Sequence, residues 1–284
     1  MQQARAHEAR AHAFTEAHLK RRQAHIKHPV FDFLFEYYPV RPAHLKTWHP
    51  GLGVLLQGDP PHAGWRDYTL IDAPGTPAVT VDLDSFMARR GQSVRYIHDL
   101  LATTATNPTQ FDCFGLHEWA MVYKTTPEQI RHDLPLRLGH ATTDVVVESH
   151  QLKCTHFDAF RFFTEPAIPL NLTVLNREDQ PRNDQCGCLH ATMDLYKWTS
   201  KLGPLIPGEV FLDAFELARD TRILDMEASP YDCREYGFGV VAIETSEGKA
   251  EYVARQRALS QRAKPIRDRL VSVTKQALSA KLLG

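Results

Sequence analysis

The sequence is poor in cysteine and contains no long hydrophobic run. It has 284 residues but only five cysteines. That odd number lacks the regular spacing of a disulfide framework, which favours a reducing, cytoplasmic setting. No stretch approaches the roughly 18 apolar residues of a transmembrane helix. No apolar run follows the basic residues at the N-terminus either, so we expect neither a membrane span nor a secretory signal.

Several catalytic motifs are also missing. The sequence contains no His-Glu-x-x-His zinc motif, no Gly-rich phosphate loop and no Gly-x-Ser-x-Gly nucleophile elbow. It also lacks the paired Cys-x2-Cys motifs of a zinc ribbon and the Cys-x-x-Cys-His motif of covalent haem attachment. These absences argue against the common serine hydrolases, phosphate-loop nucleotide hydrolases and zinc-motif proteases.

The net charge of −1 conceals an uneven distribution of charge. Residues 1–27 carry a net charge of +4 and residues 249–284 carry +7, which leaves −12 for the body between them. Both ends are rich in good helix formers, and each contains a single aromatic residue, Phe14 or Tyr252, which is not the interleaved pattern of base stacking. We therefore expect two basic helices on an acidic body, and this argues against nucleic acid as a partner.

The pattern along the chain predicts a mainly α fold, a single helical domain over residues 1–284 with a small β excursion. The excursion is the loop-rich segment 50–82, whose glycines and prolines separate three short apolar runs. The expected strands lie near 52–56, 67–71 and 78–82, and Val145–Glu148 is a further strand-like run. The expected helices are 1–27, 28–38, 83–101 with Asp82 or Asp84 as its N-cap, 113–123, 189–201, 208–226 and 249–281.

The segment Ser149–Asp158 is the most informative for chemistry. If it is helical, His150 and Cys154 lie one turn apart on one face, with Asp158 one turn further along. If it is extended, His150, Cys154, His156 and Asp158 share one side of a strand. Either geometry brings an imidazole, a thiol and a carboxylate together beside the aromatic run Phe157–Phe163. Such an apolar wall suits a planar ligand or a dry metal site.

Other histidines give weaker signals. His117 lies among aromatic residues, where a hydrogen-bonded core histidine is more common than a ligand. Its neighbour Glu118 could act as a general base, but on a helix it is expected to point elsewhere. Cys186–His190 is interpreted as small thiols at a helix entry and not as a metal site. The histidines of the N-terminal helix are expected to face solvent, and these are His7, His18 and His25.

Four stretches resemble a bacterial family often labelled 3-methyladenine DNA glycosylase. They are Phe111–Tyr123, Cys154–Phe163, Gly187–Trp198 and Ser229–Asp232. The likeness extends over most of the chain. It implies a DNA-binding, base-excision protein that would act through its two basic ends. A glycosylase of the helix–hairpin–helix kind would also have a Gly-rich hairpin and a basic face, and the sequence contains no such hairpin.

A narrower resemblance concerns the spacing His150-x-x-x-Cys154. It is similar to the site of the haem-dependent aromatic hydroxylases related to 3-methyltyrosine hydroxylase. The resemblance implies a haem attached by one thioether to Cys154 with His150 as an axial iron ligand. It also implies that His117 is the second axial ligand, although His156 could equally bind the iron. A mainly helical fold agrees with that group.

Three functions follow as hypotheses. The first is a cytoplasmic haem-dependent oxidoreductase, an oxygenase or peroxidase-like hydroxylase, acting on a small aromatic or amine-bearing substrate. In it His117 and His150 are catalytic, and His156 and Cys154 join them in cofactor binding. The second is a non-haem iron or zinc lyase or hydrolase that uses His150, His156, Asp158 and Cys154. The third is the base-excision protein. Each side chain also has a purely structural alternative, a satisfied histidine or a buried thiol.

Overall fold

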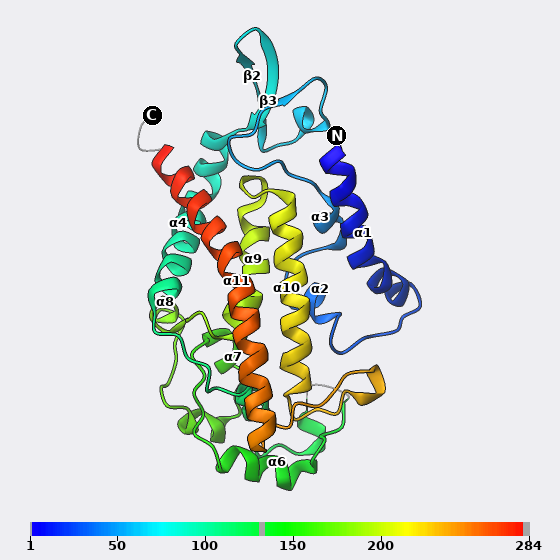
Figure 1. Cartoon of the computed structure of the whole chain (residues 1–284), viewed down its shortest axis with the longest axis vertical. Coiled ribbons are helices and arrows are strands. Elements are labelled where there is room, and N and C mark those ends of the chain that lie inside the picture. The colour runs from blue at the N-terminus through cyan, green and yellow to red at the C-terminus, as the bar shows by residue number, and fades with distance from the viewer. Residues whose placement is uncertain (1, 131–133, 281–284) are drawn as a thin grey trace.

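The computed structural model describes residues 2–130 and 134–280, and it is a helical body with a small sheet at one end (Figure 1). Two antiparallel helices, α9 (Leu189–Leu202) and α10 (Gly208–Glu227), form its centre. The long C-terminal helix α11 (Ser246–Ala280) packs against both of them and against α4 (Leu83–Thr106). This arrangement confirms the prediction of a mainly α fold with a small β excursion.

Helices α9 and α10 are separated by a short connection that the sequence marked clearly. Gly203 takes a positive φ of 52° at the end of α9, and Pro204 and Pro207 follow it. The connection places α10 alongside α9 in the opposite direction, so the start of α9 and the end of α10 lie at the same end of the bundle (Figure 1). That end, away from the sheet, holds the candidate site.

Helix α4 begins as the sequence predicts. The Asp82 carboxylate accepts a hydrogen bond from the backbone N–H of Ser85 at 2.9 Å, which satisfies an otherwise unpaired helix donor. Val94, Ile97 and Leu101 then fall on one face and are buried. This apolar face explains why α4 packs along α11 although its other side is exposed.

The sheet has three antiparallel strands in the order β1-β3-β2. They are β1 (Leu56–Gln57), β2 (Tyr68–Ala73) and β3 (Thr76–Val81). β2 and β3 lie close to the strands expected at 67–71 and 78–82, whereas β1 shares only Leu56 with the strand expected at 52–56. Gly75 has a φ of 78° in the tight turn between β2 and β3, a conformation that glycine adopts without strain. The hairpin projects from the end of the body opposite to α6 (Figure 1).

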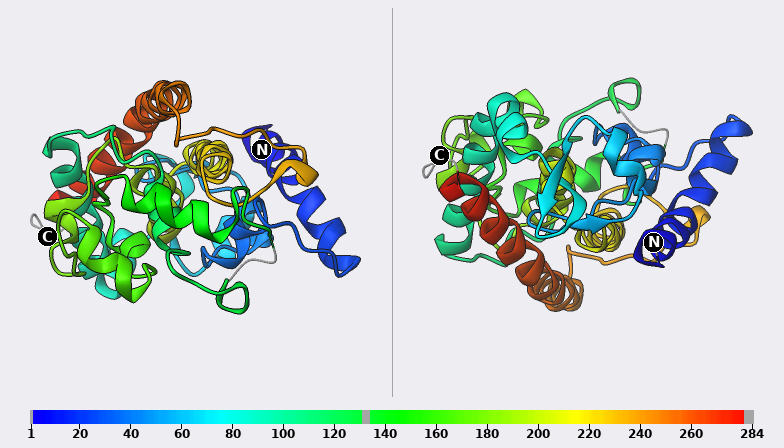
Figure 2. Two further views of the ribbon diagram at one scale, coloured as in Figure 1. Left: turned by 90° about the horizontal axis from the view of Figure 1, so that it is seen from below. Right: turned by 90° about the horizontal axis from the view of Figure 1, so that it is seen from above.

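The N-terminal helix α1 (Gln2–Gln23) lies on the opposite flank of the molecule from α4 (Figure 2). The prediction that its histidines face solvent is correct for His25 and wrong for His7 and His18. A His7 Nε2 contact to the Leu45 carbonyl (2.9 Å) and a His18 Nδ1 contact to Asp32 (2.8 Å) hold the helix down. These anchors pair polar groups, so the apolar periodicity of α1 did not indicate them.

The expected strand at Val145–Glu148 is wrong, because these residues end helix α6 (Gly139–Glu148). Three consecutive β-branched or apolar residues favour a strand locally. Here Val146 and Val147 are buried and Val145 is 59% exposed, so the segment buries one helical face. The Thr143 hydroxyl also donates to the Gly139 carbonyl one turn earlier. Tertiary packing has overridden local preference.

Two expected helices are much shorter than predicted. Only Phe33–Glu36 (α2) is helical within 28–38, and only Leu116–Ala120 (α5) within 113–123. The His28 imidazole accepts from the N–H groups of Val30 and Phe31, which sets a turn. The remaining short elements are α3 (Pro42–Lys46), α7 (Phe157–Phe160), α8 (Gln180–Asn183) and the 3₁₀ helices η1 (Pro61–Gly64), η2 (Pro127–Gln129), η3 (Glu165–Leu170), η4 (Gly203–Leu205) and η5 (Arg234–Tyr236).

One hydrophobic core contains side chains from α1 to α11, including Ala11, Leu100, Tyr196 and Ala277. A smaller group around Val122 and Met226 lies beside it. Within residues 2–130 and 134–280 there is no helix with the length and apolar character needed to cross a bilayer.

Candidate metal centre

Four metal-ligating side chains meet inside the bundle at the start of α9. They are His117 and Glu118 of α5, His190 of α9 and Asp225 of α10. One ligand atom from each lies within 4.8 Å of the corresponding atoms of the others, and all four residues are buried. We call these four residues the inner cluster. Segments more than a hundred residues apart supply them, so the cluster depends on the complete fold.

The local conformation of α5 explains why two adjacent residues both face inward. Phe114 and Gly115 have φ values of 48° and 70°, and this reversal starts a helix of little more than one turn. Every residue of α5 is buried because neighbouring elements enclose it. The expectation that Glu118 points away from His117 is therefore wrong.

Buried hydrogen bonds fix the carboxylates of the inner cluster. His117 Nε2 lies 2.9 Å from Asp225 Oδ1. The Arg222 guanidinium donates to Asp225 Oδ2 at 2.6 Å and to Glu118 Oε1 at 3.1 Å from the preceding turn of α10. Arg222 is itself 1% exposed. It therefore orients both carboxylates and supplies positive charge where water is excluded.

His190 lacks such a partner. Its Nδ1 is buried without a hydrogen bond to any described residue. Its ring lies edge-on to that of His117, with centroids 4.5 Å apart, and nearly parallel to that of His156 at 5.6 Å. Burial, followed by the neighbouring His117, lowers the pKa of His190 well below its ordinary value. A neutral imidazole with a free lone pair is the form that binds a metal.

The two carboxyl groups of the inner cluster differ in acidity. Burial alone would raise the pKa of Asp225, but its hydrogen bond with His117 and the nearby cationic groups lower it strongly. Burial, followed by the charge of Asp225, raises the pKa of Glu118. Asp225 is thus held as a carboxylate, while Glu118 takes up a proton more readily.

This donor set fits a divalent transition metal. Imidazole and carboxylate together suit iron, zinc or manganese, and ligating carboxylates are commonly held by outer hydrogen bonds such as those of Arg222. The unpaired Nδ1 of His190 is the second indication, because it lies within the cluster, whereas the other unpaired imidazole nitrogens in the described part of the chain, those of His7 and His62, do not. The residues present therefore fit a metal ion.

A second charged group lies beside the first and reaches the surface. His156 Nδ1 is 2.9 Å from Asp184 Oδ1, and its Nε2 is 3.6 Å from Asp194 Oδ2. Lys197 pairs with Asp194 and lies 3.3 Å from Asp158. We call His156, Asp158, Asp194 and Lys197 the outer cluster. Lys197 bridges its two carboxylates as Arg222 bridges those of the inner cluster, but both ring nitrogens of His156 already face carboxylates, so the outer cluster is less suited to a metal than the inner cluster.

The charges of the outer cluster support one another. Burial would lower the pKa of His156, but Asp184 and then Asp194 raise it above its ordinary value. Burial would likewise raise the pKa of Asp158, whereas Lys197 and Arg177 bring it down to about 2. The outer cluster therefore carries its charges as ion pairs near neutral pH, in contrast to the neutral His190 behind it.

A pocket of about 640 Å³ opens next to the outer cluster, along α9. We call it the α9 pocket. Asp158 and Lys197 belong both to its lining and to the outer cluster. Its volume is within the range of small-molecule sites, roughly 300–1,000 Å³. The stacked rings of His156 and His190 connect the outer cluster to the inner one.

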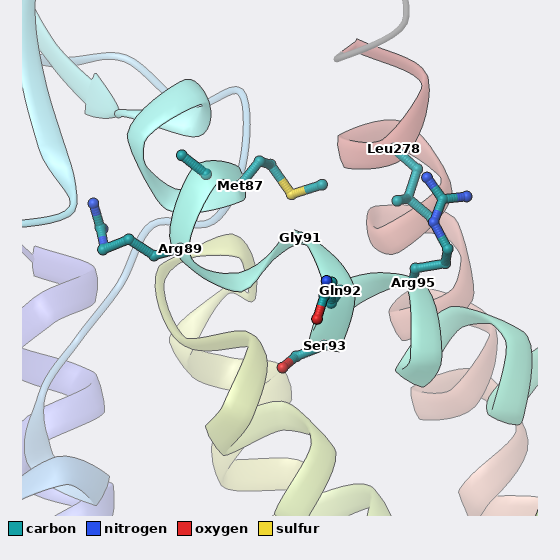
Figure 3. Close-up of a pocket in the computed structure, with 8 residues that line it drawn as sticks. Met87, Arg89, Gly91, Gln92, Ser93, Arg95 and Leu278 are labelled. Carbon is teal, nitrogen blue, oxygen red and sulfur yellow. The ribbon is translucent and has the colours of Figure 1, made fainter.

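Another cavity of about 670 Å³ lies between α4 and α11, where Met87, Gln92 and Leu278 line it (Figure 3). Its charged lining residues are Arg89 and Arg95, and the figure shows that they point to opposite sides. No carboxylate, histidine or cysteine is among the described residues that line it. It therefore lacks the groups needed for metal or acid–base chemistry.

The structure separates the residues that the sequence proposed as one site. His117 and His156 lie in the two neighbouring clusters, connected through His190. His150 instead follows the end of α6, where its Nδ1 lies 2.6 Å from the Val146 carbonyl. Cys154 is neither on a helix nor in a strand with His150, and its Sγ contacts the His156 carbonyl at 3.5 Å. Burial raises the pKa of the Cys154 thiol to about 12.

Sequence reasoning missed His190, Asp194 and Asp225 as site residues. A usable signal was present in α9, where His190, Asp194 and Lys197 follow at i, i+4 and i+7 and so share one face of an otherwise apolar helix. Asp225 follows Arg222 by three residues on α10. Buried polar residues at helical spacing were the clue.

Comparison with known proteins identifies no relative. No protein-family model, no curated protein and no solved structure matches this chain. The functional argument therefore rests on the geometry of the clusters and the α9 pocket.

Proposed function

We propose that this protein is a non-haem metal-dependent enzyme whose centre is the inner cluster. The observation that carries the proposal is the convergence of His117, Glu118, His190 and Asp225 within 4.8 Å in a buried site. The unpaired Nδ1 of His190 supports it. Iron and zinc are the metals that we favour, because both accept mixed imidazole and carboxylate ligands.

The chemistry proposed is that of a hydrolase or lyase acting on a small molecule. A bound metal would supply Lewis-acid polarisation and a water molecule that ionises near neutral pH. Asp225 and the two imidazoles would hold the metal, and Arg222 would keep the carboxylates in orientation. Glu118, whose pKa is raised, would accept or hold a proton at its carboxyl group.

In this proposal the outer cluster would connect the α9 pocket to the inner cluster. Lys197 lies at the α9 pocket and pairs with Asp194, which faces His156. The His156 ring then stacks on His190 of the inner cluster. Charged groups therefore extend from the pocket as far as His156, and the packing of His156 against His190 makes it a positioning residue for the inner cluster.

The haem enzyme and the base-excision protein stay predictions from resemblance. The groove beside Cys154 has a volume of about 170 Å³ and is lined mainly by polar residues, which suits a planar macrocycle less well. The inner cluster lies within the acidic body and not on either basic end, which favours a small-molecule substrate. The five free cysteines fit the cytoplasmic setting that we propose.

The test is metal analysis of the full-length protein purified without chelators. We expect close to one equivalent of iron or zinc per chain, no porphyrin absorbance, and loss of the metal in His190→Ala. The matched control is His150→Ala, which removes a histidine that belongs to neither cluster and should leave the metal content unchanged.

Circular dichroism of His190→Ala guards against misfolding, and His190→Cys provides a second variant that retains a metal ligand. A folded His190→Ala protein with the wild-type metal content would contradict the proposed centre. A porphyrin band that His150→Ala or Cys154→Ala abolishes would instead establish the haem hypothesis.

A further inference from the structure

The lining of the α9 pocket is cationic, although the part of the chain that forms it is acidic. Four cationic side chains line it, Arg161, Arg177, Lys197 and Lys201, against the carboxylates of Asp158 and Glu178. The body of the chain between the two basic ends has a net charge of −12. A cationic concavity in an acidic body concentrates anions at that place and repels them elsewhere.

The ion pairs within the pocket leave positive charge free. Asp158 is shared by Arg161 at 3.3 Å, Arg177 at 2.5 Å and Lys197 at 3.3 Å. Lys197 also pairs with Asp194, so two carboxylates share these three cations and leave an excess of positive charge. Lys201 has no carboxylate partner in the described part of the chain, and burial, followed by the charge of Lys197, lowers its pKa. Lys201 is therefore the cation of the lining that is most available to a bound anion.

Aromatic side chains line the same pocket. The rings of Tyr96 and Trp198 meet edge-to-face with centroids 6.1 Å apart. Tyr37 and Tyr38 form a second edge-to-face pair at 5.1 Å. Tyr38 and Trp198 are buried behind their partners, so Tyr37 and Tyr96 are the rings that a planar ligand can reach while its charged group contacts the cations.

We infer that the α9 pocket binds a small planar aromatic compound carrying a carboxylate or phosphate group. That this compound is the substrate of the enzyme rests on the proposed function of the inner cluster. The binding itself does not, because every lining residue belongs to the protein. The aromatic rings select a flat apolar body, and the excess of cations selects the anionic group.

Lys201 is the best position for a test, because it is exposed on α9 and lies over the Trp198 ring at 5.3 Å without an ion pair among the described residues. Lys201→Met removes the charge and retains most of the stem. Lys264→Met is the matched control, since Lys264 is an exposed lysine on α11 that forms a simple ion pair with Asp268.

The experiment is calorimetric titration of the chelator-treated, full-length protein at physiological ionic strength. The probes are benzoate, phenyl phosphate, neutral benzamide and inorganic phosphate. We expect one of the two aromatic anions, benzoate or phenyl phosphate, to carry the anionic group that the α9 pocket accepts. That anion should bind at least about tenfold more tightly than benzamide and inorganic phosphate. Lys201→Met should weaken that binding about fivefold, and Lys264→Met should not change it.

Three results would overturn the inference: benzamide binding as tightly as the aromatic anions, no detectable binding of either aromatic anion, or an unchanged affinity in Lys201→Met. Inorganic phosphate binding as tightly as phenyl phosphate would overturn the aromatic part. Because the titration uses metal-free protein, its result does not depend on whether the inner cluster binds a metal. A protein that contains the metal but binds no aromatic anion would refute the proposed binding site in the α9 pocket and leave the proposed metal centre standing.

Discussion

The inner and outer clusters contain similar residues but differ in what balances their charge. In the outer cluster, Lys197 lies between Asp194 and Asp158, and His156 lies between Asp194 and Asp184, which raise its pKa. In the inner cluster, Arg222 contacts Asp225 and Glu118 from one side, and His190 stays neutral with Nδ1 unpaired. The comparison teaches that an incomplete hydrogen-bond network, more than the residue types, makes the inner cluster the candidate for a metal and the outer cluster a buried ion-pair cluster.

Arg222→Met is expected to have the largest effect. It leaves Asp225 and Glu118 buried without their cation, and breaking a buried pair destabilises a protein by about 3–5 kcal/mol. Urea unfolding of the metal-free protein measures the loss. Zinc should recover part of it if the inner cluster binds metal. A loss below about 1 kcal/mol would show that the carboxylates do not depend on Arg222.

The second largest expected effect is stabilisation by zinc, which should depend on the inner cluster and not on the outer cluster. At a free zinc concentration 100 times its dissociation constant, a site present only in the folded protein adds about 2.7 kcal/mol of stability. We expect that gain in the wild type and in His156→Gln, and none in His190→Gln. Thermal unfolding with and without zinc gives the measurement. The reverse pattern would move the metal site to the outer cluster.

Lys197→Met should lower the free energy of unfolding by an intermediate amount. It removes the cation shared by Asp194 and Asp158 and costs about 2 kcal/mol, because Arg177 still contacts Asp158 and the side chain of Lys197 is 12% exposed. Urea unfolding checks the stability. Metal content should stay at the wild-type level, and its loss in a folded Lys197→Met protein would contradict the separation of the two clusters.

The smallest expected effect is a difference between metal-free variants in how the free energy of unfolding depends on pH. The lowered pKa of His190 reduces stability as the pH falls below about 6.5, where the unfolded chain takes up a proton. The raised pKa of His156 reduces stability as the pH rises above about 6.5, where only the unfolded chain releases one. Each slope is at most about 1.4 kcal/mol per pH unit.

The measurement is urea unfolding at a series of pH values. His190→Gln should flatten the acid side of the stability curve and leave the alkaline side unchanged, and His156→Gln should do the opposite. If both variants flattened the same side, the two imidazoles would not differ in charge.

Much of the fold was predictable because the signals were local. The boundaries expected for the helices at 189–201 and 208–226 differ from those observed by a single residue at their C-terminal ends. The proline and glycine breaks and the apolar periodicity act over a few residues and do not depend on distant packing. The run Val145–Glu148 was misassigned for the same reason, since local preference favoured a strand and only packing made it a helix.

The candidate site was only partly predictable. His117 and His156 were singled out for their aromatic surroundings and spacing, whereas His190 was assigned to a structural helix entry. The relation of His150 to Cys154 depended on a regular element that does not form, because the chain after α6 runs without helix or strand until α7. Spacing rules give side-chain geometry only where the backbone is regular.

The sequence by itself determined a mainly helical chain with basic ends, an acidic body and histidines available for chemistry. The apolar periodicity and the distribution of charge follow directly from the order of residues, so they can be determined without coordinates. Only the tertiary structure decided which histidines meet, because α5, α9 and α10 bring together residues separated by up to 108 positions, as in the contact of His117 with Asp225. Burial then set their proton affinities, and burial is a property of the packed fold.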